Sequence, residues 1–224
     1  MRSNFYNSAG AIFSEEHTES CVRVGKEWVL GVAHYRKQLR HIITRQLSFD
    51  LVDKINGGKA QYSKRNCFSF KCLDADFENV EGFNVVWKWQ EHKNLQVGLF
   101  RVNKNIQGEY PLESDDILLG GDKNPVKANS PVFVAGFPRD TWTREIVEGR
   151  ISSVSDMHAY ADLSRAVPGF SGGPVFSSDG KLLGVLLNNS DNVGARNVKF
   201  TLLSAISAHF KDKGFALNQT PTLI

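Results

Sequence analysis

The sequence is poor in cysteine, and its three cysteines, Cys21, Cys67 and Cys72, make an odd set. Their spacing matches no zinc-ligand pattern, and three thiols cannot all pair into a disulfide framework. We therefore expect small buried side chains in strands. The same scarcity favours the cytoplasm or another reducing intracellular compartment.

Long apolar runs and blocks of one charge are also missing. No stretch approaches the roughly 18 consecutive apolar residues of a membrane-spanning helix, and residues 1–15 lack the apolar core of a signal peptide. The 27 basic and 24 acidic side chains are interspersed and leave a formal net charge of +3. This balance gives no support to nucleic-acid or membrane binding. We expect a globular protein that is neither secreted nor anchored.

Short apolar segments rich in Val, Ile, Phe, Trp and Leu are abundant, and clusters of Gly, Asn, Asp, Ser and Pro separate them. This rhythm is typical of an all-β sandwich or barrel. One segment, Ser204–Lys213, predicts a helix with Ser204 as its N-cap and Gly214 as its stop. The expected strands are Ser20–Val24, Trp28–Ala33, His41–Phe49, Cys67–Cys72, Phe83–Trp89, Val97–Val102, Pro131–Phe137, Ile146–Ser153, Gly173–Phe176, Lys181–Leu187 and Val198–Leu202.

The stretch Asn103–Asn129 has the weakest strand pattern and carries several acidic, Gly and Pro residues. We interpret it as the crossover between two halves, residues 1–108 and residues 109–224. The C-terminal half would include the helix and a tail.

The most informative segment is Pro168–Val175, which reads PGFSGGPV. A serine hydroxyl is a weak nucleophile that needs a base beside it and donors for the oxyanion it generates. Glycines let the backbone turn tightly and aim its N–H groups at one point. Ser171 is therefore the candidate nucleophile, with the N–H groups of Gly169 and Ser171 as the oxyanion hole. A tight turn before a buried strand is the plainer alternative for Ser-Gly-Gly-Pro alone.

A candidate base ends an apolar strand upstream, where Trp28–Tyr35 reads WVLGVAHY. This string, together with PGFSGGPV and the later DGKLLGV, resembles the trypsin-like, chymotrypsin-fold serine proteases, and the HtrA-type protease domain most of all. The resemblance implies two six-stranded antiparallel Greek-key barrels with a short C-terminal helix. The first barrel would carry His34 as general base, and the second would carry Ser171.

The same resemblance implies an activity. The protein would be a serine endopeptidase that hydrolyses a protein or peptide substrate through an acyl-enzyme on Ser171. No metal or organic cofactor is needed, and the other histidines have no paired ligand spacing. The α/β-hydrolases share Gly-x-Ser-x-Gly, but they need alternating helices and a later histidine that this sequence does not offer.

The third member of the triad departs from the family pattern. The strand that normally opens with aspartate reads QVGLFRV here, so Gln96 stands at the acid position. Three interpretations remain open. An amide from Gln96 or Asn94 orients His34; a carboxylate substitutes, with Glu91, Asp74 and Asp76 as candidates; or the protein keeps the fold as a catalytically impaired binding module.

Substrate choice depends on residues around the pocket for the side chain before the scissile bond. By the family pattern, the floor lies about six residues before the nucleophile, where Arg165 stands, and Leu187 and Asn188 belong to the wall. A guanidinium at the floor would favour an acidic substrate side chain. The alternative is an Arg165 that points into solvent.

Overall fold

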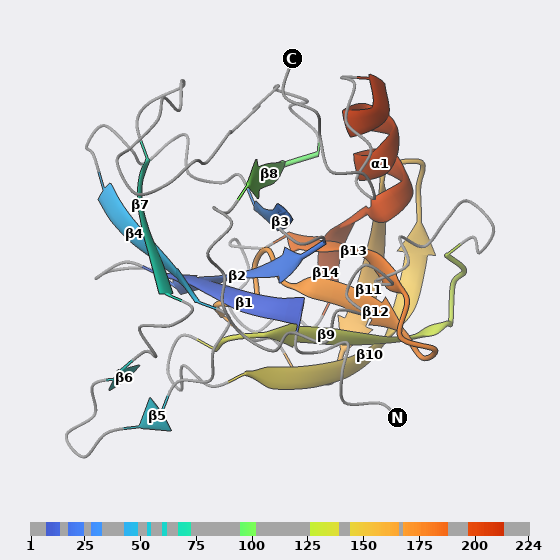
Figure 1. The fold of residues 1–224 in the computed structure, drawn as a ribbon. Coiled ribbons are helices and arrows are strands. Elements are labelled where there is room, and N and C mark those ends of the chain that lie inside the picture. Colours follow the sequence, from blue (N-terminus) through green and yellow to red (C-terminus); the bar gives the residue numbers. More distant parts are fainter. Residues whose placement is uncertain are drawn as a thin grey trace.

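The computed structural model describes residues 8–13, 18–24, 28–32, 43–48, 53–54, 60–61, 67–72, 95–101, 126–138, 144–165, 168–187 and 197–212. Figure 1 shows two β-structured halves side by side, with one helix on the C-terminal half.

The N-terminal half is a six-stranded antiparallel sheet in the order β7-β4-β1-β2-β3-β8. A separate pair, β5 and β6, lies at the lower left of Figure 1. The strands are β1 (Ala9–Phe13), β2 (Thr18–Arg23), β3 (Trp28–Val32), β4 (Ile43–Ser48), β5 (Asp53–Lys54), β6 (Ala60–Gln61), β7 (Cys67–Cys72) and β8 (Val97–Arg101).

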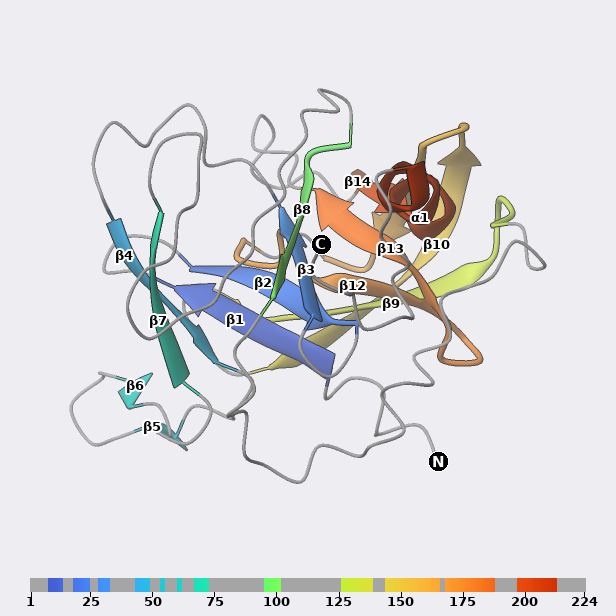
Figure 2. The same cartoon turned by 45° about the horizontal axis from the view of Figure 1, so that its top comes forward.

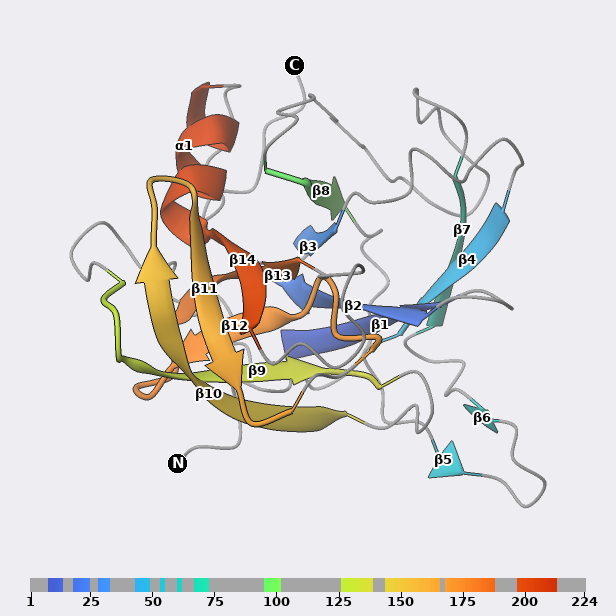
Figure 3. The ribbon, with the colours of Figure 1, turned by 180° about the vertical axis from the view of Figure 1, so that it is seen from behind.

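The C-terminal half is a closed barrel in the order β10-β11-β14-β13-β12-β9, seen from behind in Figure 3. Its strand order repeats that of the other half, because β12-β9-β10-β11-β14 follows the same path as β4-β1-β2-β3-β8. The elements are β9 (Pro131–Gly136), β10 (Glu145–Val154), β11 (His158–Leu163), β12 (Pro174–Ser177), β13 (Leu182–Leu187), β14 (Asn197–Leu202) and α1 (Leu203–Asp212).

The predicted all-β fold with two six-stranded halves and a short C-terminal helix is therefore confirmed. Closure differs between the halves, since β13 pairs with both neighbours whereas no pairing of β7 with β8 occurs among the described residues. The predicted boundary after residue 108 and the predicted strand Phe83–Trp89 lie outside those residues. No helix of the described part is long and apolar enough to cross a membrane.

Four strands, β1, β5, β6 and β11, and the start of the helix differ from the sequence prediction. Strands β1 and β11 were not expected, because their inward positions hold alanines, which have low β propensity and a weak apolar signal. In β11, Ala159 and Ala161 are both fully buried. The helix begins at Leu203, so Ser204 lies in its first turn and is not the N-cap.

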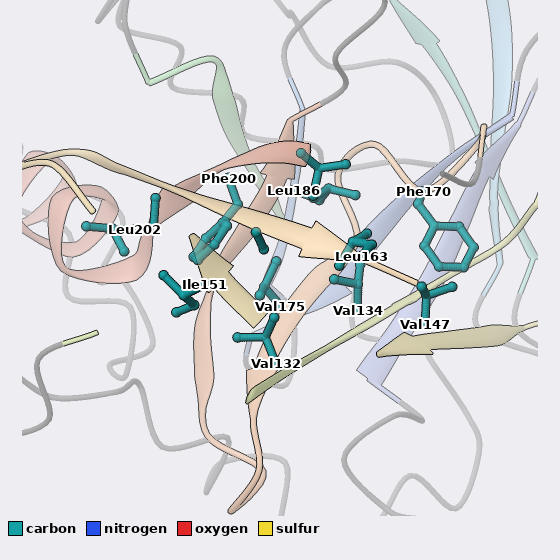
Figure 4. Close-up of a cluster of buried hydrophobic side chains, with 13 residues drawn as sticks. Val132, Val134, Val147, Ile151, Leu163, Phe170, Val175, Leu186, Phe200 and Leu202 are labelled. Carbon is teal, nitrogen blue, oxygen red and sulfur yellow. The ribbon is translucent and has the colours of Figure 1, made fainter. Parts of the chain in front are cut away.

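Alternation along the strands divides the buried side chains into two cores. The barrel core, drawn in Figure 4, fills the interior of the C-terminal barrel. Its members are Val132, Val134, Val147, Ile151, Ala159, Ala161, Leu163, Phe170, Val175, Leu186, Val198, Phe200 and Leu202.

The interface core joins the two halves. It takes Ala9, Ala11, Val22, Val24 and Leu30 from the N-terminal sheet and Ala135, Phe137, Phe176, Leu182, Val185, Leu203 and Ile206 from the C-terminal half. The helix α1, seen nearly end-on in Figure 2, contributes the last two of these residues. The sheet and the barrel are thus held together by apolar packing as well as by the hydrogen bonds described below.

Candidate active site

Ser171 lies in the turn that leads into β12, here called the serine loop (residues 168–173). The hydroxyl-bearing residue is only 6% exposed. The N–H of Gly173 donates to the carbonyl of Phe170 at 2.8 Å, which makes the turn tight. Gly169 and Gly172 have φ values of 99° and 86°, a region that side chains disfavour. The glycines around Ser171 are therefore required by the backbone path.

Two sets of contacts fix the serine loop to the barrel. The N–H of Gly172 donates to the carbonyl of Leu186 at 2.8 Å, and the N–H of Leu186 donates to Gly173 at 2.9 Å. The Phe170 side chain, 1% exposed, packs in the barrel core (Figure 4). The residue before the nucleophile is thus an apolar anchor.

Ser20 of β2 connects the serine loop to the N-terminal sheet. Its backbone N–H donates to the carbonyl of Ser171 at 2.7 Å. Its hydroxyl donates to the carbonyl of Gly169 at 2.8 Å and accepts from the N–H of Phe137 at 2.9 Å. Among the described residues, no backbone oxygen accepts from the N–H of Gly169 or of Ser171, the two predicted oxyanion donors.

The end of β3 also approaches the serine loop. A methyl group added at Gly172 would lie on the carbonyl oxygen of Ser20 and 3.1 Å from the backbone nitrogen of Val32. Val32 is the last residue of β3 and precedes His34 by two positions. His34 itself lies outside the described residues.

Gln96 stands at the start of β8, next to the end of β3. The register pairs Val32 with Val97, so Gln96 comes directly before the last pair of the β3–β8 ladder. Its side chain is exposed, and its backbone has a φ of 50°. The hydroxyl of Thr201 on β14 donates to the carbonyl of Leu95 at 2.7 Å, which ties this point of the N-terminal half to the barrel. The other orienting candidates, Asn94, Glu91, Asp74 and Asp76, lie outside the described residues.

Of the predicted pocket residues, Arg165 and Leu187 are described and Asn188 is not. The Arg165 side chain is 58% exposed and forms an ion pair with Glu145 of β10. Leu187 ends β13 and is buried. In this structure the Arg165 guanidinium is therefore largely exposed and already has a carboxylate partner within the protein.

Cys21, on the same strand as Ser20, is not a second nucleophile. Burial raises the pKa of the Cys21 thiol far above its usual range, so this cysteine stays protonated and unreactive. Cys21 is free and buried in β2, as expected. No cluster of His, Cys, Asp or Glu suited to a metal ion occurs in the described part. The arrangement can offer a hydroxyl and two backbone donors, and nothing in it requires a metal.

Two residues with roles in this geometry, Ser20 and Thr201, were not identified from the sequence. Each is a single hydroxyl residue in a strand, and each acts on a carbonyl far away in the chain. Ser20 alternates in phase with Val22 and Val24 of the interface core, whereas Thr201 alternates out of phase with the barrel-facing Phe200 and Leu202. Both hydroxyl residues are fully buried.

Comparisons with known proteins agree with this geometry. The family model of the trypsin-like peptidase domain matches residues 22–185, a region that contains His34, Gln96 and Ser171. No curated protein sequence is significantly similar to the chain.

Solved structures with the same fold are numerous. Human heparin binding protein superposes with a TM-score of 0.67 at 13% identity, with 100% of this chain and 97% of that one covered. The protease domain of MamO from Magnetospirillum magneticum gives 0.58 at 14% identity, covering 93% and 98%. Rv3671c from M. tuberculosis H37Rv, a serine-to-alanine mutant in an inactive form, gives 0.58 at 15% identity, covering 94% and 88%. Identities this low show a shared fold only. The chemistry has to be argued from the residues of the site.

Proposed function

The chain belongs to the trypsin-like peptidase domain family, and from that premise we propose that it is a serine endopeptidase with Ser171 as nucleophile and His34 as general base. The observation that carries the proposal is the approach of Val32 to Gly172, the residue after the nucleophile. Two peptide units span at most about 7 Å. A residue two positions after Val32 is thus within chain reach of the serine loop, and this supports the assignment of His34 as the base.

The reaction follows from these roles. His34 accepts the proton of the Ser171 hydroxyl as the oxygen attacks the substrate carbonyl, and the N–H groups of Gly169 and Ser171 receive the resulting oxyanion. Collapse of this intermediate breaks the peptide bond, and His34 gives the proton to the departing amine. A water molecule activated by His34 then hydrolyses the acyl-enzyme and returns the hydroxyl to Ser171.

A fluorophosphonate probe tests the nucleophile and the base together. We expect labelling of the wild type, none of Ser171→Ala, and a rate lower by about 10²–10⁴-fold in His34→Ala, the range of general-base catalysis. Ser204→Ala, which removes an exposed hydroxyl from α1, is the matched control and should label normally. Labelling of Ser171→Ala at the wild-type rate would refute the assignment.

A second candidate function is a protease-like binding module with impaired catalysis. The observation that favours it is the exposed amide of Gln96 at the acid position, since a buried carboxylate fixes the imidazole tautomer and stabilises the imidazolium. Gln96→Asp separates the two functions. If Gln96 orients His34 in a working enzyme, wild type labels and turns over peptide, and the aspartate raises kcat. A wild type that never labels, beside a Gln96→Asp variant that does, identifies the binding module.

We propose that Arg165 determines the preferred substrate side chain before the scissile bond. Its guanidinium would select an acidic side chain before the scissile bond, in exchange for its ion pair with Glu145. Leu187 and Asn188 would line the wall of the same pocket. Peptides that differ only at this residue provide the test: cleavage after Glu should exceed cleavage after Lys, and Arg165→Gln should abolish the difference. Faster cleavage after Lys by the wild type would discard this role.

A further inference from the structure

We propose that Ser20, on β2 of the N-terminal sheet, is a positioning residue that aims the two oxyanion donors of the serine loop. This inference rests on the proposed function, because it assigns a partner to the N–H groups of Gly169 and Ser171. It adds a residue from the other half of the molecule to a loop that lies wholly in the C-terminal half.

The argument starts from the peptide units that carry the two donors. The N–H of Gly169 belongs to the unit that joins residues 168 and 169, and the N–H of Ser171 belongs to the unit that joins residues 170 and 171. Between them lies the unit whose carbonyl is that of Gly169, and after them comes the unit whose carbonyl is that of Ser171. Ser20 binds both of these carbonyls, at 2.8 Å through its hydroxyl and at 2.7 Å through its N–H.

The planarity of the peptide makes this arrangement effective. Each unit is rigid, so the relative aim of two N–H groups depends on the rotation of the unit between them. Ser20 holds that intermediate unit and also the one that follows Ser171. The unit that bears the Ser171 N–H is therefore clamped on both sides by one residue.

Gly169 is the point where such a clamp is needed. Its φ of 99° lies in a region open to glycine, and a glycine can rotate its flanking peptide units at little cost. A rotation of the unit after Gly169 would turn the two donors away from a common point. The hydrogen bond from the Ser20 hydroxyl opposes this rotation directly.

The hydroxyl itself is held in one orientation. It accepts from the N–H of Phe137 at 2.9 Å, so its single proton is directed toward the carbonyl of Gly169. Ser20 is 0% exposed, and a methyl group at Gly136 would come within 2.7 Å of its oxygen. Bulk water therefore does not reach the hydroxyl to compete for its contact with Gly169.

Ser20→Ala tests the proposal, with Ser177→Ala as a matched control. The Ser177 hydroxyl also accepts from a backbone N–H, that of Lys181, and its proton is shared between the Asp179 carboxylate and the Lys181 carbonyl in the turn after β12. Loss of one oxyanion donor lowers kcat by about 10²–10³-fold. For donors that are misaimed but present, we expect a smaller loss of roughly 10–100-fold in Ser20→Ala, with KM within about twofold of wild type.

A peptide boronate sharpens the test, because its adduct with the serine places an oxygen at the oxyanion position. Its inhibition constant should rise in Ser20→Ala by the same factor as kcat/KM falls, and both values should stay at the wild-type level in Ser177→Ala. A kcat of Ser20→Ala within twofold of wild type would overturn the proposal. So would a loss that merely follows the fraction of unfolded protein.

A readout without catalysis distinguishes failure of this inference from failure of the proposed function. Amide hydrogen exchange reports the clamp even in a protein that does not label with fluorophosphonate. Exchange at Gly172 and Gly173, whose N–H groups donate to the carbonyls of Leu186 and Phe170, should accelerate at least tenfold in Ser20→Ala and remain unchanged in Ser177→Ala. Unchanged exchange in Ser20→Ala removes the clamp, whatever the activity of the wild type.

Discussion

The barrel core and the interface core are both fully apolar, but they are built from different parts of the chain and support different parts of the site. The barrel core comes from one continuous stretch between Val132 and Leu202, and it includes Phe170, the neighbour of the candidate nucleophile. The interface core takes residues from both halves, and none of its members belongs to the serine loop.

The two cores therefore have different roles. One determines the shape of the site, meaning the conformation of the serine loop, and the other determines its assembly, meaning the approach of β2 and β3 to that loop. The barrel core, through Phe170, holds the serine loop in its own conformation. The interface core keeps β2 and β3 against that loop, so that Ser20 and the end of β3 reach it. Strand β12 serves both cores, since Val175 faces the barrel core and Phe176 faces the interface core.

The largest expected effect comes from emptying one aromatic site in each core. Phe170 and Phe176 are 1% and 0% exposed, so Phe170→Ala and Phe176→Ala each leave a cavity. Each should lower the free energy of unfolding by about 3–5 kcal/mol. Urea-induced unfolding followed by tryptophan fluorescence measures the loss.

Activity should then separate the two variants. Per folded molecule, Phe170→Ala should lose about 10²-fold in peptide turnover, because a small displacement of a nucleophile costs that much. Phe176→Ala should stay within a few fold of wild type. Equal activity of the two folded variants would contradict the assignment of the serine loop to the barrel core.

The next effect concerns a polar link between the halves. The fully buried hydroxyl of Thr201 donates to the carbonyl of Leu95, while Phe200 and Leu202 on either side of it face the barrel core. Thr201→Val keeps the shape but removes the donor, and should lower the free energy of unfolding by about 1–3 kcal/mol. Thr201→Ser keeps the hydroxyl and should be the more stable variant in the same denaturation experiment. A valine variant as stable as wild type would show that this link contributes nothing.

Much of the fold was predictable because its strands carry a local pattern. Segments such as Trp28–Val32 and Leu182–Leu187 are short, apolar and bounded by turn residues, and both are strands. Strand β11 was missed because its inward positions hold small alanines, which the barrel interior requires and the local pattern does not reveal. The register that brings Gln96 beside the end of β3 is a tertiary property, and only the family resemblance anticipated it.

The site divides in the same way. Ser171 and Gly169 lie in one continuous motif, so the sequence alone proposes them. Ser20 and Thr201 bind carbonyls 149 and 106 residues away along the chain. A lone serine or threonine in a strand has many possible partners, and pairing across that distance is decided by packing of the two halves. The roles of such residues can be identified only from the structure, in which the two halves are packed together.

The smallest effect lies outside both cores, in the turn between β12 and β13. A hydrogen bond from Ser177, and then the nearby Lys181, lower the pKa of the Asp179 carboxyl. A lowered pKa in the folded state stabilises the fold above the unfolded value of about 3.9, and this contribution is lost as the pH falls through the folded-state pKa. Asp179→Asn keeps an acceptor for Ser177 but removes the charge. The Asp179 side chain is 56% exposed, so the difference from wild type at neutral pH should stay under about 1 kcal/mol.

Urea-induced unfolding at neutral pH and again well below the usual pKa of aspartate measures that difference. The difference in free energy of unfolding between wild type and Asp179→Asn should be present at neutral pH and vanish at the low pH. In a Lys181→Gln background, the difference at neutral pH should also shrink, because the ion pair with Asp179 is gone. Peptide turnover should not change in any of these variants, since the turn closes the end of β12 away from the serine loop. A loss of turnover in Asp179→Asn would mean that the two ends of β12 are coupled, and the separation between shape and assembly would then fail at a strand that both cores share.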